Sequence, residues 1–186
     1  MFEVILLGIA LAMDSLAVSI ANGIKYSNYG KKEMLLASFS FGFFQGAMPL
    51  LGYLVFTPLL KYISKFDHWV VLIILAFIGI DMIKESFEPE EAIKEKSEKF
   101  TFKILIMESI ATAIDALSVG ITLPDFDVNP YLTCLVILLA TFIICLIGHK
   151  LGKKIAMLLK NKALLLGGII LVLLGLKEVL TAYGIL

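Results

Sequence analysis

Arginine is absent from this sequence of 186 residues, so all sixteen basic residues are lysines. Lysine does not make the planar, two-pronged contacts with phosphate that arginine makes. Sixteen acidic residues balance the lysines, and a formal net charge of zero gives no basic field to attract a nucleic acid. We therefore expect no nucleic-acid partner.

Cysteine is also scarce, because the chain has only Cys134 and Cys145. Both lie in one apolar run, and about 16 Å of helix would separate them, too far for a disulfide. We interpret them as small buried apolar side chains. The ATP-binding pattern Gly-x-x-x-x-Gly-Lys-[Ser/Thr] is missing as well. We expect neither a transmembrane thiol relay nor an ATP-driven machine, and we do not expect an enzyme.

Apolar residues, in contrast, are abundant: they make up 60% of the chain, and the mean hydropathy is +0.97. A soluble domain is nearer ~45–50% apolar. The apolar runs cover residues 2–22, 34–60, 69–87, 104–123, 131–147 and 163–183. Since about 20 apolar residues of helix cross a bilayer, we predict an all-α integral membrane protein with six transmembrane helices, and we expect the first to be retained. The prediction is a single membrane domain over residues 1–186.

The lysines predict how the helices are oriented. Thirteen of them fall in the links after the first, third and fifth runs, whereas the links after the second and fourth carry only Lys61 and Lys65. Lysine-rich links stay in the cytoplasm. We therefore expect both termini to be extracytoplasmic, with Trp69 and Tyr183 near the outer membrane interface.

The two halves of the chain resemble each other. Residues 9–20 and 110–121 align without a gap and share seven of twelve residues, among them Asp14 and Asp115. Further along, Gly52 matches Gly152. We predict repeat one over residues 1–87, a charged cytoplasmic linker over 88–103, and repeat two over 104–186. Because each repeat has three helices, the second copy must enter the membrane from the opposite side, which gives inverted repeats.

The matched aspartates are the candidates for chemistry. Asp14 and Asp115 each fall near the middle of an apolar run, where a lone charge costs roughly 2.5–3.5 kcal/mol. Brought together, the two carboxylates would bind a divalent cation or share a proton. Thr112 and Ser118 add oxygen atoms nearby, and an oxygen-rich site favours Mg²⁺, Mn²⁺ or Ca²⁺. The alternative is a neutral Asp that joins two helices by a hydrogen bond.

Four further ionisable residues lie in or next to the apolar runs. The repeat places Asp81 and Lys177 at related positions, so we expect either a buried ion pair, a direct transport role for Asp81, or solvation at the membrane interface. Glu108 and His149 lie toward the cytoplasmic ends of their runs. We interpret both of them as interfacial residues.

The doubled aspartate motif, at residues 12–19 and 113–120, together with residues 41–49 and the glycines at 167–168, resembles the MntP-type manganese efflux pumps of the lysine-exporter superfamily. The resemblance covers the whole chain. It implies six helices in two inverted repeats, and export of Mn²⁺ across the plasma membrane of a bacterium or archaeon. Its intramembrane ligands match Asp14 and Asp115. A further acidic position of the family falls near Gln45, which is not acidic here, so Asp81 is a candidate substitute.

The resemblance therefore leads to a secondary active exporter with alternating access, in which Mn²⁺ is the substrate and no cofactor is needed. Protons are the candidate coupling ion, and a homodimer is left open. Two other interpretations stay open beside it. One is an exporter of another divalent cation. The other is a non-transporting membrane protein of spore or envelope assembly, because related sporulation proteins share the repeat.

Overall fold

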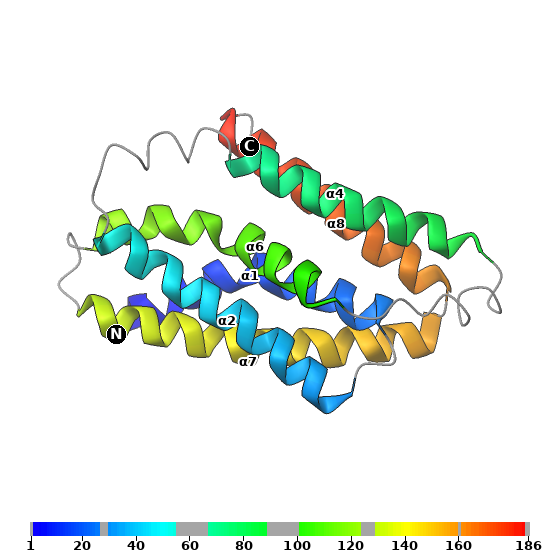
Figure 1. The fold of residues 1–186 in the computed structure, drawn as a ribbon, viewed down its shortest axis with the longest axis horizontal. Coiled ribbons are helices and arrows are strands. Elements are labelled where there is room, and N and C mark those ends of the chain that lie inside the picture. The colour runs from blue at the N-terminus through cyan, green and yellow to red at the C-terminus, as the bar shows by residue number, and fades with distance from the viewer. Residues whose placement is uncertain are drawn as a thin grey trace.

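The computed structural model describes residues 2–26, 30–54, 67–88, 101–123, 129–159 and 161–184 (Figure 1). These residues form helices and contain no strand, as the sequence predicts. The helices are α1 (Phe2–Lys25), α2 (Lys31–Leu54), α4 (Asp67–Ser86), α6 (Phe102–Thr122), α7 (Pro130–Leu159) and α8 (Asn161–Ala182). Residues 55–66 and the centre of the predicted linker, 89–100, lie outside the described residues.

Helix α7 is longer than the hydropathy predicts. The apolar run ends at residue 147, but the helix continues to Leu159 through Lys150, Lys153 and Lys154. Lysine is a good helix former, so the loss of apolar character ends the predicted span without ending the helix. Beyond these lysines α7 ends in a second apolar stretch, residues 155–159, in which Ile155 and Ala156 pack against the core.

The helices form two groups. Helices α1, α2, α6 and α7 pack together, with α1 along α7 and α2 along both α6 and α7, while α4 and α8 form a pair beside them (Figure 1). Helices α1 and α6 run in opposite directions. The two chain termini point toward one end of the molecule, and the lysine-bearing ends of α1, α4 and α7 lie toward the other (Figure 1).

Glycines allow the closest helix contacts. A Cβ atom on Gly52 of α2 would collide with the backbone oxygen of Leu117 on α6, and it would lie 3.2 Å from the Cα of Gly120. A Cβ on Gly79 of α4 would lie 2.7 Å from the backbone oxygen of Gly168 on α8. Side chains at these positions would force the helices apart.

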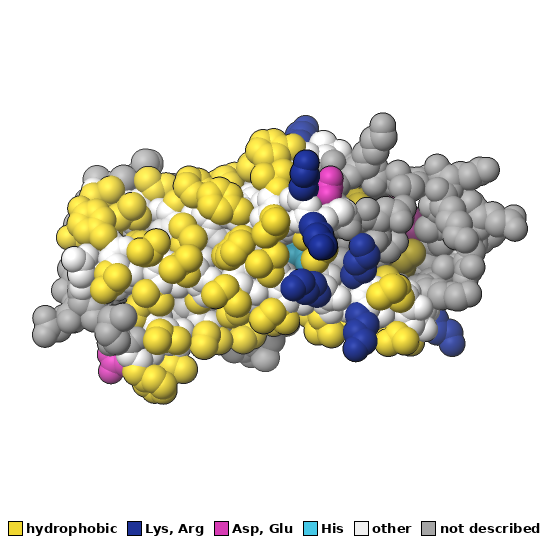
Figure 2. Space-filling view, turned by 90° about the horizontal axis from the view of Figure 1, so that it is seen from below, with side chains coloured by type: hydrophobic (Ala, Val, Ile, Leu, Met, Phe, Trp, Pro, Cys, Tyr) yellow, Lys and Arg dark blue, Asp and Glu magenta, His cyan; other side chains and the backbone are white. Residues whose placement is uncertain are grey.

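The outer surface is apolar over most of its length. Large apolar side chains are exposed on every helix, and examples are Phe39, Ile73, Phe77 and Ile143. Figure 2 shows such side chains covering one face of the molecule, with a band of lysines toward one end. Four helices, α1, α2, α7 and α8, are long and apolar enough to cross a membrane. The other two, α4 and α6, carry carboxylates within their length. This surface suits lipid rather than water.

Candidate functional site

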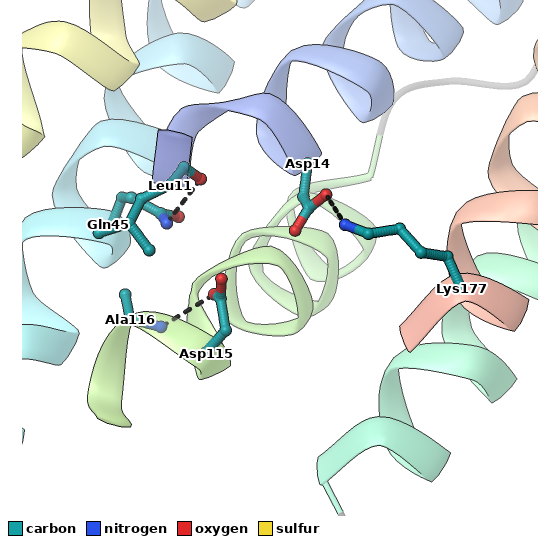
Figure 3. Close-up of polar contacts among 6 residues, drawn as sticks. All are labelled: Leu11, Asp14, Gln45, Asp115, Ala116 and Lys177. Carbon is teal, nitrogen blue, oxygen red and sulfur yellow. Dashed lines mark hydrogen bonds and ion pairs between the residues drawn. The ribbon is translucent and has the colours of Figure 1, made fainter. Parts of the chain in front are cut away.

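The two matched aspartates lie on different helices of the packed core. Asp14 is in the middle of α1 and Asp115 is in the second half of α6, and both side chains are partly buried. The ammonium of Lys177, on α8, donates to Asp14 Oδ1 at 3.3 Å. The backbone N–H of Ala116 donates to Asp115 Oδ1 at 2.9 Å. In Figure 3 the two carboxylates point into the same space between α1, α6 and α8.

That space is a small cavity of about 10 Å³, which is room for about one water molecule or one ion. Its polar wall consists of Asp14, Asp115 and the hydroxyl-bearing Thr112. The remaining residues of the wall are apolar and come from α4, α6 and α8: Val71, Leu75, Ala111, Ile114 and Leu174. Two carboxylates facing one small, largely apolar space make it attractive to a cation.

A buried chain of polar groups lies next to the cavity. The hydroxyl of Ser15 lies 3.2 Å from Thr112 Oγ1 and 3.4 Å from Gln45 Oε1, so it connects α1 with α6 and α2. The amide nitrogen of Gln45 donates to the backbone oxygen of Leu11 at 2.9 Å (Figure 3). Gln45 therefore contacts α1 beside Asp14, but it does not line the cavity. Its contacts support the position of Ser15 and α1.

Asp81 lies elsewhere. Its carboxylate forms an ion pair with Lys25, at the end of α1. Lys25 is eleven residues from Asp14, which corresponds to about 16 Å along the helix. The predicted ion pair between Asp81 and Lys177 is wrong, because Asp81 pairs with Lys25 at the end of α1, whereas Lys177 pairs with Asp14 in its middle. Two residues at matching positions of two repeats do not have to touch. They lie side by side only when both are close to the axis that relates the repeats.

Ser118 is also outside the cavity. It lies one turn beyond Asp115 on α6, and its side chain is exposed on the outer surface. Among the described residues, the structure thus brings together Asp14, Asp115 and Thr112, with Gln45 one contact away. Ser118 and Asp81 are not part of this group.

The interpretation of Glu108 and His149 as interfacial is wrong, because both side chains are fully buried. Asn22 Nδ2 donates to Glu108 Oε2 at 2.6 Å, and Glu108 Oε1 has no hydrogen-bond partner. His149 Nδ1 donates to the backbone oxygen of Cys145 at 2.8 Å, since a carbonyl can only accept. Hydropathy alone places these residues near the ends of apolar runs, where water is the default neighbour.

A helical pattern could have identified Glu108. Glu108, Thr112 and Asp115 are spaced four and three residues apart, so they share one face of α6. The structure supports this, because Glu108 and Thr112 are both buried. By contrast, nothing in the sequence predicts Lys177 as the partner of Asp14, since the pairing depends on how α8 packs beside α1.

No group of three or more His, Cys, Asp or Glu residues converges on one point within the described ranges. A cation in the cavity would therefore contact two carboxylates and neutral oxygen atoms. Oxygen donors without imidazole or thiolate favour hard cations such as Mg²⁺, Mn²⁺ and Ca²⁺.

The chain is similar in sequence to several known proteins. A family model described as "Putative manganese efflux pump" matches residues 28–179. A protein from Campylobacter hominis named "Putative manganese efflux pump MntP" is 40% identical over 99% of this chain and 100% of its own length. A relative from Wolinella succinogenes is 42% identical, over 97% of each chain. A relative from the archaeon Methanosphaera stadtmanae is 38% identical, over 97% of this chain and 99% of its own.

No solved structure matches this chain. The relatives nevertheless cover nearly all of it, and the match includes both halves. Together with several helices apolar enough to cross a bilayer, this makes the chain a multi-pass membrane protein. It belongs to the MntP family of manganese efflux pumps.

Proposed function

We propose that this chain is a secondary active exporter of Mn²⁺ in the plasma membrane of a prokaryote, and that Asp14 and Asp115 bind the ion. The observation that carries the proposal is the shared cavity, where carboxylates from α1 and α6 face one small space. Thr112 adds a neutral oxygen. The names of the relatives supply the ion, and the oxygen donors are compatible with it.

The membrane topology is part of the proposal. All six helices cross the bilayer, both termini are extracytoplasmic, and the lysine-rich ends of α1, α4 and α7 face the cytoplasm. Helices α4 and α6 cross with their carboxylates directed toward other helices. In this orientation the cavity lies near the middle of the membrane, because Asp14 is in the middle of α1.

Inverted repeats explain why one carboxylate comes from each half. Helices α1 and α6 are antiparallel, as inversion requires (Figure 1). The pairing of α1 with α7 corresponds to the pairing of α6 with α2 when the halves are exchanged. The contact of Gly79 with Gly168 likewise corresponds to that of Gly175 with Leu72. These exchanged contacts support a pseudo-two-fold axis in the membrane plane, about which the repeats rock to expose the site to each side in turn.

The driving force in this proposal is proton exchange at the same carboxylates. Expelling a divalent cation against a potential of about 100 mV costs about 4.6 kcal/mol, at ~2.3 kcal/mol per charge. Protons entering in exchange return positive charge to the cytoplasm and neutralise the negative charge that the empty site leaves uncompensated. This removes the cost of leaving that charge unpaired in the membrane.

Transport by purified protein in vesicles tests the proposal. Proteoliposomes with a Mn²⁺-sensitive dye inside would compare wild type with Asp14→Asn and Asp115→Asn, each of which removes one charge from the cavity. We expect Mn²⁺ transport to fall at least about tenfold in both. The matched control is Ser118→Ala on α6, which lies outside the cavity and should transport normally. Unchanged transport in both Asp variants would show that these residues do not bind the ion, whereas no Mn²⁺ transport by wild type would favour a non-transporting role in envelope or spore assembly.

A further inference from the structure

Lys177 contacts a carboxylate of the cavity wall but does not itself line the cavity. Its ammonium lies 3.3 Å from Asp14 Oδ1, while its side chain is 53% exposed and that of Asp14 is 18% exposed. Figure 3 shows the lysine reaching from α8 to the carboxylate of Asp14 from the right, while Asp115 of α6 lies below and to the left of Asp14. A positive charge of the protein's own is therefore in contact with one of the two carboxylates that line the cavity.

This contact joins the two groups of helices. Helix α8 packs mainly on α4, and the α4/α8 pair stands beside the other four helices (Figure 1). The cavity lies at this boundary, because Leu75 of α4 and Leu174 of α8 face Asp14 of α1 across it. Breaking the contact between Lys177 and Asp14 would remove a charged link between α1 and α8 without disturbing the packing of α8 on α4.

We propose that Lys177 is a tethered cation that competes with the transported divalent cation for Asp14. The inference rests on the proposed function of the cavity and adds a residue that sets its affinity and its preference for divalent ions. With the ammonium in place, the two carboxylates and the lysine sum to one negative charge. A divalent ion bound beside the ammonium would leave one positive charge in an apolar site, whereas an ion that displaces it leaves none.

The competition favours divalent over monovalent ions. At equal distance a divalent ion attracts Asp14 twice as strongly as an ammonium does. A monovalent ion gains no charge advantage, and it must also compete with a group that is held at the site by the chain. The tethered ammonium therefore discriminates against Na⁺ and K⁺, which are abundant, without a separate filter.

The displaced ammonium can reach water at the nearby membrane surface. Lys177 is five residues before the end of α8 at Ala182, which is about 8 Å along the helix. Its four-carbon stem can extend toward the membrane surface while the ammonium reaches water. When the ion leaves, the ammonium returns to Asp14, so the empty carrier keeps part of its charge compensation. Ion binding and the α1–α8 link thus exclude each other.

Mn²⁺ binding to the purified full-length protein in detergent tests this competition. Titration calorimetry would compare wild type with Lys177→Met, which removes the ammonium, and Lys177→Arg, which keeps a positive charge. We expect Lys177→Met to bind Mn²⁺ about tenfold more tightly, and its binding to become sensitive to Na⁺. Lys177→Arg should stay within about threefold of wild type. The matched control is Lys162→Met, which removes an exposed lysine from the other end of α8.

A measurement on the wild type does not depend on whether a variant folds. Acetylation of lysines by an amine-reactive ester, mapped by mass spectrometry, would be compared with and without MnCl₂ at constant ionic strength. We expect Mn²⁺ to raise the reactivity of Lys177 at least about threefold and to leave Lys162 unchanged. Unchanged reactivity at Lys177 under saturating Mn²⁺ would overturn the inference.

The results separate this inference from the proposed function. If Asp14→Asn abolishes Mn²⁺ binding while Lys177→Met binds no more tightly than wild type, the competition is wrong and the proposed ion site stands. If neither wild type nor Lys177→Met binds Mn²⁺, the proposed function is wrong. The inference that Lys177 competes with the ion then fails too, because it rests on that function.

Discussion

The side chains of Asn22 and Glu108 join α1 to α6 inside the protein, with Asn22 Nδ2 donating to Glu108 Oε2 at 2.6 Å. Both residues are fully buried. They lie two helical turns from Asp14 and Asp115, respectively, toward the lysine-rich end of the molecule. The same two helices that present the aspartates are therefore fixed to each other by a polar contact outside the cavity.

Replacing Glu108 should test how much this contact contributes. Glu108→Leu leaves the buried amide of Asn22 without its acceptor, and we expect a loss of about 1–3 kcal/mol of folding stability. Glu108→Gln should be stable, because its oxygen can accept from Asn22 and its amide can donate to Asn22 Oδ1, which lacks a partner. Thermal unfolding in detergent, followed by the fluorescence of Trp69, measures both.

The double variant Asn22→Leu with Glu108→Leu is the control for the interaction itself. If the hydrogen bond is responsible, the double variant should be less destabilised than the sum of the two single variants, because neither polar group is left unpaired. Additive losses would show that the two residues stabilise the protein independently.

The close approach of α2 to α6 gives a second prediction. A Cβ on Gly52 would collide with the backbone oxygen of Leu117, two residues beyond Asp115. Because the obstacle is backbone, Gly52→Ala should push α6 outward, lower stability by about 1–3 kcal/mol and weaken Mn²⁺ binding. Unfolding temperature and Mn²⁺ affinity can be measured on the same sample.

Gly8→Ala is the matched control for Gly52→Ala. Gly8 also lies in a helix contact, but the nearest atoms to its Cβ are 3.4 Å away, an ordinary contact distance. It should therefore have wild-type stability and affinity. Equal losses in the two variants would mean that replacing any glycine weakens the fold, independent of the α2–α6 contact.

The ion pair of Asp81 with Lys25 gives a third prediction. The Lys25 side chain is 5% exposed, so Asp81→Asn would leave a nearly buried ammonium beside a neutral amide. We expect about 2 kcal/mol of destabilisation, with little change in Mn²⁺ affinity because Asp81 is outside the cavity. The second substitution Lys25→Met should restore stability. A large loss of Mn²⁺ affinity in the stable double variant would instead make Asp81 a ligand.

The sequence predicts some parts of this molecule well and others not at all. Hydropathy identifies six helices because each is a continuous apolar run, and the repeat identifies Asp14 and Asp115 because equivalent positions keep the same residue. The partner of Asp14 is different. It depends on how α8 is rotated and tilted against α1, and this is set by packing among residues that look alike in sequence, such as Leu, Ile and Val.

The rotation of a single helix also separates the two hydroxyl residues that the sequence proposes beside Asp115. Thr112 and Ser118 are both within two turns of it on α6, but Thr112 lines the cavity and Ser118 is exposed. Periodicity predicts that they lie on different faces, since six residues span about 600° at 100° per residue. It does not predict which face points toward α1.

This difference between the two hydroxyls gives the last prediction. Thr112→Val keeps the shape of a side chain that lines the cavity but removes its hydroxyl, and we expect Mn²⁺ affinity to fall about tenfold, the equivalent of about 1.4 kcal/mol. Thr112→Ser keeps the hydroxyl and should bind within about threefold of wild type. Ser118→Val should bind Mn²⁺ normally, because its side chain faces outward. Wild-type affinity in Thr112→Val would remove Thr112 from the ligand set and leave the two aspartates as the side chains that hold the ion.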